Sequence, residues 1–208
     1  MLNKHNLMIA KIGKKSDKNY AQYVKVNKEK TIVTDGQILV EVTRPETQKD
    51  YPEISGFKPA SREKEKDFYI GIDEALDIAK SLEKTKIPIF ENALISIDDN
   101  NIKIAITNTD SNKIFTIPQP DSDFRYPDTD SAMPIEEPKV IFHIDVKLLM
   151  QVLAQFESFM KKESVKAIKV EIFDRLKPIK IVAQNDSQRM MALVMPLKID
   201  ETEEKSPG

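Results

Sequence analysis

Alternating apolar and polar residues near the carboxyl end predict a β-hairpin at residues 176–198. A turn-forming stretch, Asn185 to Ser187, separates the two halves. Apolar side chains occupy every second position of both halves and are expected on one face of the hairpin: Ile179, Ile181, Ala183, Met191, Leu193 and Met195. We therefore expect a pair of half-buried strands here.

The same pattern occurs twice upstream, at residues 30–42 and 104–117. Each turn places an aspartate, a small residue and a side-chain amide between two apolar runs, and Asp35, Asp110 and Asp186 lie 75 and 76 residues apart. A second landmark, Tyr51-Pro52 and Tyr126-Pro127, repeats after 75 residues. A fixed spacing is typical of a duplicated supersecondary unit, although any one of these turns alone is a common dipeptide.

Two amphipathic helices are predicted, at residues 73–83 and 145–160. Asp73 and Asp145 are their expected N-caps, because a carboxylate accepts hydrogen bonds from the first helical amides. Each helix follows a short apolar strand and precedes three more: 68–72, 93–97, 102–107 and 113–117 in one copy, and 140–144, 165–172, 178–183 and 190–197 in the other. The pattern predicts an α+β fold of repeated β-α-β-β-β units, within a domain at residues 67–199.

Residues 1–66 show strands at 7–12, 20–26 and 31–42 but no convincing helix. We interpret them as a truncated, mostly β half domain followed by a linker, with the charged run Arg62–Lys66 in a solvated loop. A second connector at 118–138 is rich in proline and acidic residues and is also expected to be solvated. Residues 200–208 are expected to be a disordered tail.

Composition narrows the functional class. The chain has 208 residues, a net charge of −2 and no cysteine, which excludes disulfides and thiolate metal sites and favours a soluble cytoplasmic protein. The five glycines are isolated, so no phosphate-binding loop is present, and His5 and His143 belong to different units. The acidic connector lacks the glycine of a calcium loop. We expect no enzyme activity, no metal and no cofactor.

Several short motifs carry a family resemblance. Thr34 to Leu39 (TDGQIL), Tyr51 to Glu53 (YPE), Phe142 to Asp145 (FHID) and Ala192 to Lys198 (ALVMPLK) follow one another in the order of similar motifs in the bacterial DNA polymerase III beta subunit. The chain therefore resembles this sliding-clamp family over most of residues 31–198. It departs from the family at Gln37-Ile38, where the family has His-Arg, and in holding about one and a half domains.

The resemblance implies a DNA-clamp-like fold with helices on one face of antiparallel sheets and facing DNA. It also implies a pocket for a short linear motif of partner proteins, which maps to Thr34, Gly36, Leu39, Pro52, Leu176, Met195, Pro196 and Leu197. The residues assigned to the DNA-facing side are Lys80, Lys84, Lys147, Gln151, Lys161 and Lys162. A mildly basic helix face of this kind suits salt-sensitive phosphate contacts, and an ordinary solvated face is the alternative.

Two functional hypotheses follow. One is a processivity factor that forms a homo-oligomer around duplex DNA and tethers a polymerase or other replication protein. The alternative is a clamp-derived adaptor or competitor that binds the same peptide motifs without encircling DNA, which the near-neutral face of the 73–83 helix favours. A hydrolase or metal enzyme is a distant third.

Overall fold

The computed structural model describes residues 1–46, 50–61, 65–82, 87–98, 101–108, 111–185 and 187–197. It divides the chain into two compact units, Met1–Met133 and Pro134–Gly208, each described by itself below. The expected boundary lay at 66/67, whereas the observed one lies at 133/134. Along the described residues, no helix is long and apolar enough to cross a membrane.

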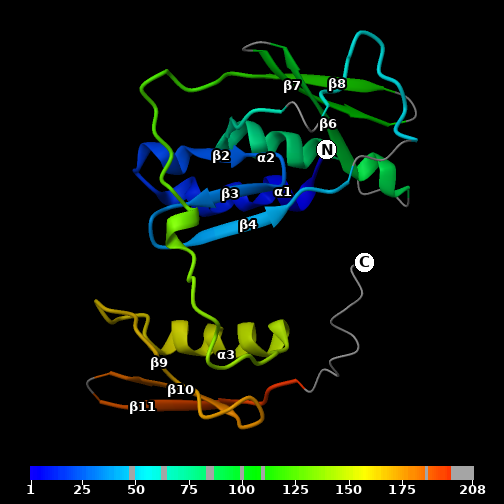
Figure 1. Ribbon diagram of the computed structural model, residues 1–208. Coiled ribbons are helices and arrows are strands. Elements are labelled where there is room, and N and C mark those ends of the chain that lie inside the picture. Colours follow the sequence, from blue (N-terminus) through cyan, green and yellow to red (C-terminus); the bar gives the residue numbers. More distant parts are fainter. Residues whose placement is uncertain are drawn as a thin grey trace. The chain divides into compact units, whose positions relative to one another are not determined.

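The first unit contains two four-stranded antiparallel sheets, ordered β4-β3-β2-β5 and β1-β6-β7-β8 (Figure 1). In chain order its elements are β1 (Leu2–Asn3), α1 (Lys4–Met8), the 3₁₀ helices η1 (Ile9–Lys15) and η2 (Asn19–Gln22), β2 (Tyr23–Val26), β3 (Lys30–Thr34), β4 (Leu39–Thr43), β5 (Phe68–Gly71), α2 (Ile72–Ser81), η4 (Pro88–Glu91), β6 (Asn92–Asp98), β7 (Asn101–Thr107), β8 (Asn112–Ile117) and η5 (Asp130–Ala132).

The first unit consists of two halves, α1 with β1 to β4 and α2 with β5 to β8, and these halves exchange their first strands. β1 precedes α1 but pairs with β6, and β5 precedes α2 but pairs with β2. One hydrophobic core contains buried residues of both sheets and both helices, among them Leu7, Val24, Ile78 and Ile104. Residues 1–66 therefore cannot bury their apolar surface alone, which explains why the domain boundary lies after β8.

The first half has a helix, so the expectation of a helix-free half domain and of a strand at 7–12 is wrong. Asn3 caps α1 by accepting hydrogen bonds from the amides of His5 and Asn6, at 2.9 and 3.1 Å. Asn6 is itself buried, and its Nδ2 donates to Thr31 Oγ1 and the Val42 carbonyl, each at 3.1 Å. These hydrogen bonds tie α1 to strands β3 and β4.

Close packing of η1 depends on Gly13. A Cβ atom at this position would lie 1.9 Å from the Ala21 carbonyl oxygen and 2.6 Å from Ile72 Cδ1 of α2. Only a residue without a side chain fits between these two neighbours. The short helix α1 and its 3₁₀ extension thus pack directly against α2.

Both sheets of the first unit are covered on their outer faces by connector segments. Tyr51 donates from its hydroxyl to the Asn92 carbonyl at 3.0 Å, and Phe57 packs on the cluster formed by Ile54 and Leu94 over sheet β1-β6-β7-β8. Tyr126 makes the matching bond to the Ile32 carbonyl, at 3.1 Å, on the other sheet. The two Tyr-Pro landmarks of the sequence therefore have the same structural role on two sheets.

The second connector is not a solvated linker over its whole length, contrary to expectation. Phe124 lies edge-on to Tyr23 and Tyr69, with ring centroids 4.9 and 5.0 Å away, and Gln119 bonds both the amide and the carbonyl of Tyr69. Residues 134–138 are exposed, as expected. Aromatic residues in the acidic stretch explain why its first part folds back onto the sheet.

A buried ion pair joins the residue after β4, Arg44, to the segment that precedes β5, at Glu65. Arg44 and Glu65 have side-chain exposures of 0% and 4%, and the Arg44 guanidinium also donates to the carbonyls of Met1 and Asn27, at 3.2 and 2.6 Å. Glu65 belongs to the charged run that the sequence analysis placed in a solvated loop, and for this residue the expectation is wrong. Within that run, Arg62, Glu63 and Lys64 lie outside the described residues.

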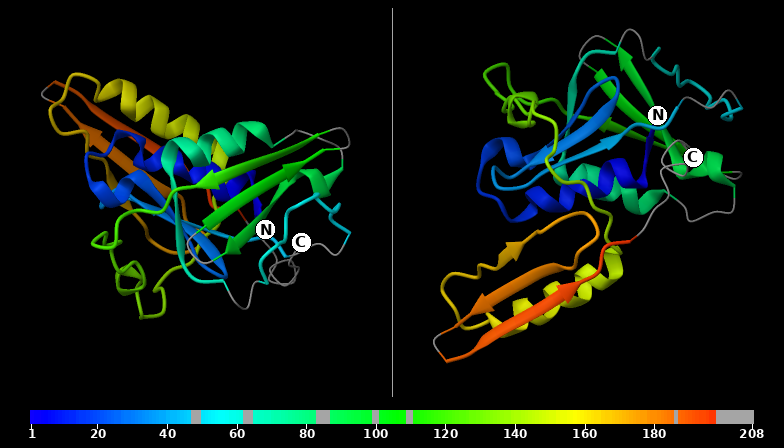
Figure 2. Two further views of the ribbon diagram at one scale, coloured as in Figure 1. Left: turned by 90° about the horizontal axis from the view of Figure 1, so that it is seen from above. Right: turned by 60° about the horizontal axis from the view of Figure 1, so that its bottom comes forward.

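The described residues of the second unit form one helix on one face of a three-stranded antiparallel sheet (Figure 2). Its elements are α3 (Val146–Phe159), β9 (Lys169–Glu171), β10 (Ile179–Gln184) and β11 (Arg189–Val194). Asp145 caps α3 as predicted, accepting from the amides of Lys147 and Leu148 at 2.7 and 3.0 Å. Residues 140–144 form only an isolated bridge, His143 to Leu197, and not the expected strand.

The register of the β10-β11 hairpin corrects one sequence assignment. Ile181 pairs with Ala192 and Ala183 with Met190, so these alternate residues face α3 together. Met191, Leu193 and Met195 lie on the opposite face with exposures of 54%, 57% and 60%. Both faces of β11 carry apolar residues, and a one-residue slip between them is invisible to an alternation pattern.

Candidate peptide-binding and DNA-facing surfaces

Three of the expected peptide-binding residues meet at the turn between β3 and β4. Thr34 is buried, and its Oγ1 accepts from the Gly36 amide at 3.0 Å. Gly36 has φ +88, a conformation that side chains disfavour, and Leu39 begins β4. The Asp35 carboxylate accepts from the amides of Gln37 and Ile38, which lower its pKa. The hairpin is thereby held as a defined turn.

Pro52 lies elsewhere in the unit. Its neighbour Tyr51 is bonded to β6, so Pro52 belongs to the cover of sheet β1-β6-β7-β8, whereas Thr34 and Leu39 belong to the other sheet. Beside the β3-β4 hairpin lies the segment at Tyr126, whose ring is 6.4 Å from that of Tyr20. The repeated Tyr-Pro pair was the sequence signal for this segment, but the sequence analysis did not assign it to the site.

The other four expected peptide-binding residues gather in the second unit. The last pair of the β10-β11 ladder is Ile179 with Val194, so Leu176 and Met195 through Leu197 leave the sheet at the same end. Leu176, Met195 and Leu197 are 60%, 60% and 44% exposed. The Leu197 amide donates to the His143 carbonyl at 2.8 Å, which holds this strand end in place.

This end of the second unit exposes apolar side chains where a strand ends. Met195 is flexible and polarisable, and Pro196 lacks an amide hydrogen, so it cannot continue a hydrogen-bonded ladder. The turn at Asp174 is fixed by bonds from the amides of Leu176 and Lys177, both at 2.8 Å. The expected peptide-binding residues thus form one group within each unit, apart from Pro52, and a joint pocket stays a prediction.

Among the residues assigned to the DNA-facing side, those that the structure describes lie on α2, on α3 and just after α3. Lys147 and Gln151 of α3 are exposed, as are Lys161 and Lys162. Lys80 of α2 donates to Asp77 at 2.9 Å, and this hydrogen bond raises its pKa. Lys84 lies outside the described residues.

The first helical segment adds positive charge that the sequence analysis missed. Lys11, Lys14 and Lys15 of η1 are exposed, and η1 packs against α2. Apolar residues at Leu7 and Ala10, three positions apart, and the capping pair Asn3 and Asn6 were the available signals for a helix here. The strand expected at residues 7–12 contains Lys11, and no element was expected at Lys14 and Lys15.

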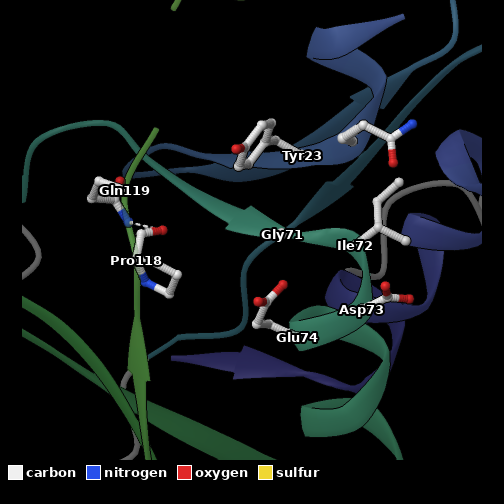
Figure 3. Close-up of a pocket in the computed structure, with 8 residues that line it drawn as sticks. Tyr23, Gly71, Ile72, Asp73, Glu74, Pro118 and Gln119 are labelled. Atoms are coloured by element: carbon white, nitrogen blue, oxygen red, sulfur yellow. Dashed lines mark hydrogen bonds between the residues drawn. The ribbon is translucent and has the colours of Figure 1, made fainter. Parts of the chain in front are cut away.

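A separate hollow of about 250 Å³ opens beside the start of α2 (Figure 3). Gly71 is the N-cap of α2, so the expectation that Asp73 caps this helix is wrong; Asp73 and Glu74 form its first turn and line the hollow with Tyr23 and Gln119. The two carboxylates in its lining disfavour an anionic ligand. None of the expected site residues lines it, and no group of three or more acidic or histidine residues within the described ranges is arranged to hold a metal.

Comparison with known proteins identifies the fold. No family model matches the chain, and no curated protein sequence matches it. Among solved structures, the DNA polymerase sliding clamp from Pseudomonas aeruginosa matches with a TM-score of 0.58 and 15% identity, over 94% of this chain and 50% of that one. PCNA from Thermococcus kodakaraensis matches with a TM-score of 0.55 and 13% identity, over 92% of this chain and 69% of that one. The antiparallel α+β fold described above is therefore that of sliding clamps.

Proposed function

We propose that the protein is a sliding-clamp-like processivity factor that tethers a polymerase or another replication protein to duplex DNA. The observation that carries this proposal is the likeness of fold to two sliding clamps over more than nine-tenths of the chain. In this proposal the chain acts as a homo-oligomer in the cytoplasm and performs no catalysis. The non-encircling peptide-binding adaptor is the second candidate, and the Asp77 to Lys80 pairing on α2 favours it.

A threefold repeat of one β-α-β-β-β unit underlies the proposed fold. Equivalent hydrogen bonds in the three hairpin turns support this repeat. In each turn the side-chain oxygen of the first residue accepts a hydrogen bond from the backbone amide three residues on, and these first residues are Asp35, Asn108 and Asn185. The amide of each also donates to the carbonyl three residues on, at 3.2, 3.1 and 3.0 Å. Asp110 and Asp186, the aspartates of the sequence comparison, lie outside the described residues.

The peptide site is tested by fluorescence anisotropy with a labelled Gln-Leu-x-Leu-Phe peptide. Met195→Ala with Leu197→Ala should weaken binding at least about tenfold, because the two exposed side chains form the apolar anchor. Lys169→Ala, on the edge strand of the same sheet, is the matched control and should leave the affinity unchanged. An unaltered affinity in the double variant would remove this site.

The DNA-facing surface is tested on a duplex oligonucleotide over a salt series. Replacing Lys11, Lys14 and Lys15 with glutamine should weaken DNA binding. It should also reduce the slope of the logarithm of the binding constant against the logarithm of salt concentration by up to about three phosphate contacts, because each contact releases counterions. Lys58→Gln, on the connector over the outer sheet face, should change neither. Equal losses in both proteins would refute a helical DNA-facing side, and absence of any DNA binding would favour the adaptor.

A further inference from the structure

The helix of the second unit is more apolar than its counterpart in the first but far less buried. α2 buries five of its ten residues, and its exposed positions include Asp73, Asp77 and Lys80. α3 buries only Phe156 among fourteen residues, while Lys147 and Glu157 are its only charged ones. An apolar helix surface of this kind is normally covered in a folded domain.

Three apolar residues on one face of α3 correspond to residues of α2 that are buried. The N-caps Gly71 and Asp145 are 74 residues apart, and the same offset relates three residues on one face of each helix. On α2 these residues are buried, and on α3 they are exposed: Ile72 (5%), Leu76 (8%) and Ala79 (0%), against Val146 (68%), Met150 (65%) and Leu153 (38%). We call Val146, Met150 and Leu153 the α3 stripe.

In the first unit, this face of α2 packs on the helix of the other half. Ile72 Cδ1 lies where a side chain at Gly13 of η1 would be, and Leu76 and Ala79 share a core with Leu7 of α1. Residues at i, i+4 and i+7 lie on one side of a helix, so all three face the same neighbour. The α3 stripe is therefore the surface that a second half would cover.

The sheet of the second unit shows an independent gap. In the first unit, β2 and β6 each follow a helix and pair with the first strand of the other half, β5 and β1. Their counterpart β9 pairs with β10 alone, so within the described residues its outer edge is open. Val170 of β9 lies opposite Ile181 on the helix side of the sheet yet stays 49% exposed.

The strand that would fill such a gap is present in the same chain. Residues 140–144 precede α3 as β1 precedes α1, and their sequence, VIFHI, predicts a strand. Val140 and Ile141 are nevertheless 40% and 62% exposed, and only His143 forms a bridge. In the first unit this element always pairs with the partner half, which the second unit does not contain among its described residues.

We propose that the second unit binds the same unit of a second copy of this chain and so completes a two-half domain. Residues 140–144 of each copy add to the open edge of β9 in the other, and the two α3 stripes pack together. A self-complementary contact of this kind is isologous and closes as a pair. Strand addition also protects an exposed apolar edge. The inference goes beyond the proposed function, since it holds whether or not DNA is encircled.

Cross-linking tests the contact directly, because the chain has no cysteine and any thiol cross-link must join two copies. Met150→Cys and Leu153→Cys lie near the middle of α3, where a residue beside a two-fold axis meets its own counterpart. A short bifunctional maleimide should join these variants into covalent pairs, and Gln155→Cys, exposed on another side of α3, should give far less. Equal yields from all three would overturn the proposal.

Light scattering over a concentration series gives the second measurement. The wild-type protein should reach at least twice the 23.8 kDa of one chain, and Met150→Glu should weaken this association about tenfold or more while Gln155→Glu does not. Circular dichroism verifies that the variants are folded. A wild-type protein that stays monomeric at every concentration would overturn the proposal and leave a different partner for this surface. Peptide binding by Met150→Glu should be unchanged, so failure of the interface is distinguishable from failure of the proposed function.

Discussion

Removing the Glu65 carboxylate should be among the most damaging single changes to the first unit. The change removes the carboxylate that pairs with the buried Arg44 guanidinium, which also donates hydrogen bonds to the Met1 and Asn27 carbonyls. Breaking a buried pair from one side costs about 3–5 kcal/mol, because the remaining charge was desolvated on folding and is no longer compensated. We therefore expect Glu65→Ala to lower the stability of this unit by that amount.

The expected loss translates into a large thermal shift. The unit spans Met1–Met133, and unfolding entropy is about 2.1 cal/mol/K per residue, so a loss of 3–5 kcal/mol lowers its Tm by about 11–18 °C. Circular dichroism during heating and in urea measures the change. Asp77→Ala, which breaks the solvent-exposed Asp77 to Lys80 pair, should leave the stability nearly unchanged, because water screens such a pair.

A double replacement separates the charge from the packing. Arg44→Met combined with Glu65→Leu removes both charges and keeps apolar volume, so it should recover much of the stability lost in Glu65→Ala. A loss below about 1 kcal/mol in Glu65→Ala would refute the reasoning, since it would mean that the Arg44 charge does not depend on Glu65 for its compensation. A double variant no more stable than Glu65→Ala would also refute the reasoning.

Two further stability predictions follow. Gly13→Ala should destabilise the first unit by about 1–3 kcal/mol in urea unfolding, because its Cβ would collide with the Ala21 carbonyl. At Gly56 a Cβ would have no atom within 4 Å, so Gly56→Ala should cost only its backbone strain at φ +72. Equal effects of the two variants would contradict the close-packing argument. Glu171→Gln should destabilise the second unit near neutral pH, because hydrogen bonds from Lys169 and Lys180 lower the pKa of Glu171 from 4.5 to about 2. A carboxylate with a lowered pKa stabilises the fold at pH values above its ordinary pKa and loses that effect as the pH falls through its lowered pKa. The stability difference from wild type should therefore shrink between pH 4.5 and 2, and a constant difference would contradict this prediction.

Local pattern was sufficient for most strands and for two helices. The alternation at β3-β4, β6 through β8 and β10-β11 predicted those hairpins, and Asp145 proved to be a helix cap, because these signals depend only on neighbours in sequence. The motifs quoted for the clamp resemblance indicated the fold that the structural comparison then showed. The strand assigned to residues 7–12 failed, since apolar residues there suit either a short helix or a strand until the partner surface is known.

Only the tertiary structure decided which surfaces are paired and which stay open. The exchange of β1 and β5 between two halves joins residues far apart in sequence, so no local pattern could place the domain boundary at 133/134. Burial of Glu65 and the cover of the sheet by Phe124 likewise depend on distant partners. For α3 the sequence determined an apolar helix, but the exposure of its outer face among the described residues is a property of the fold, because burial is set by what packs against a face and not by the residues that form it.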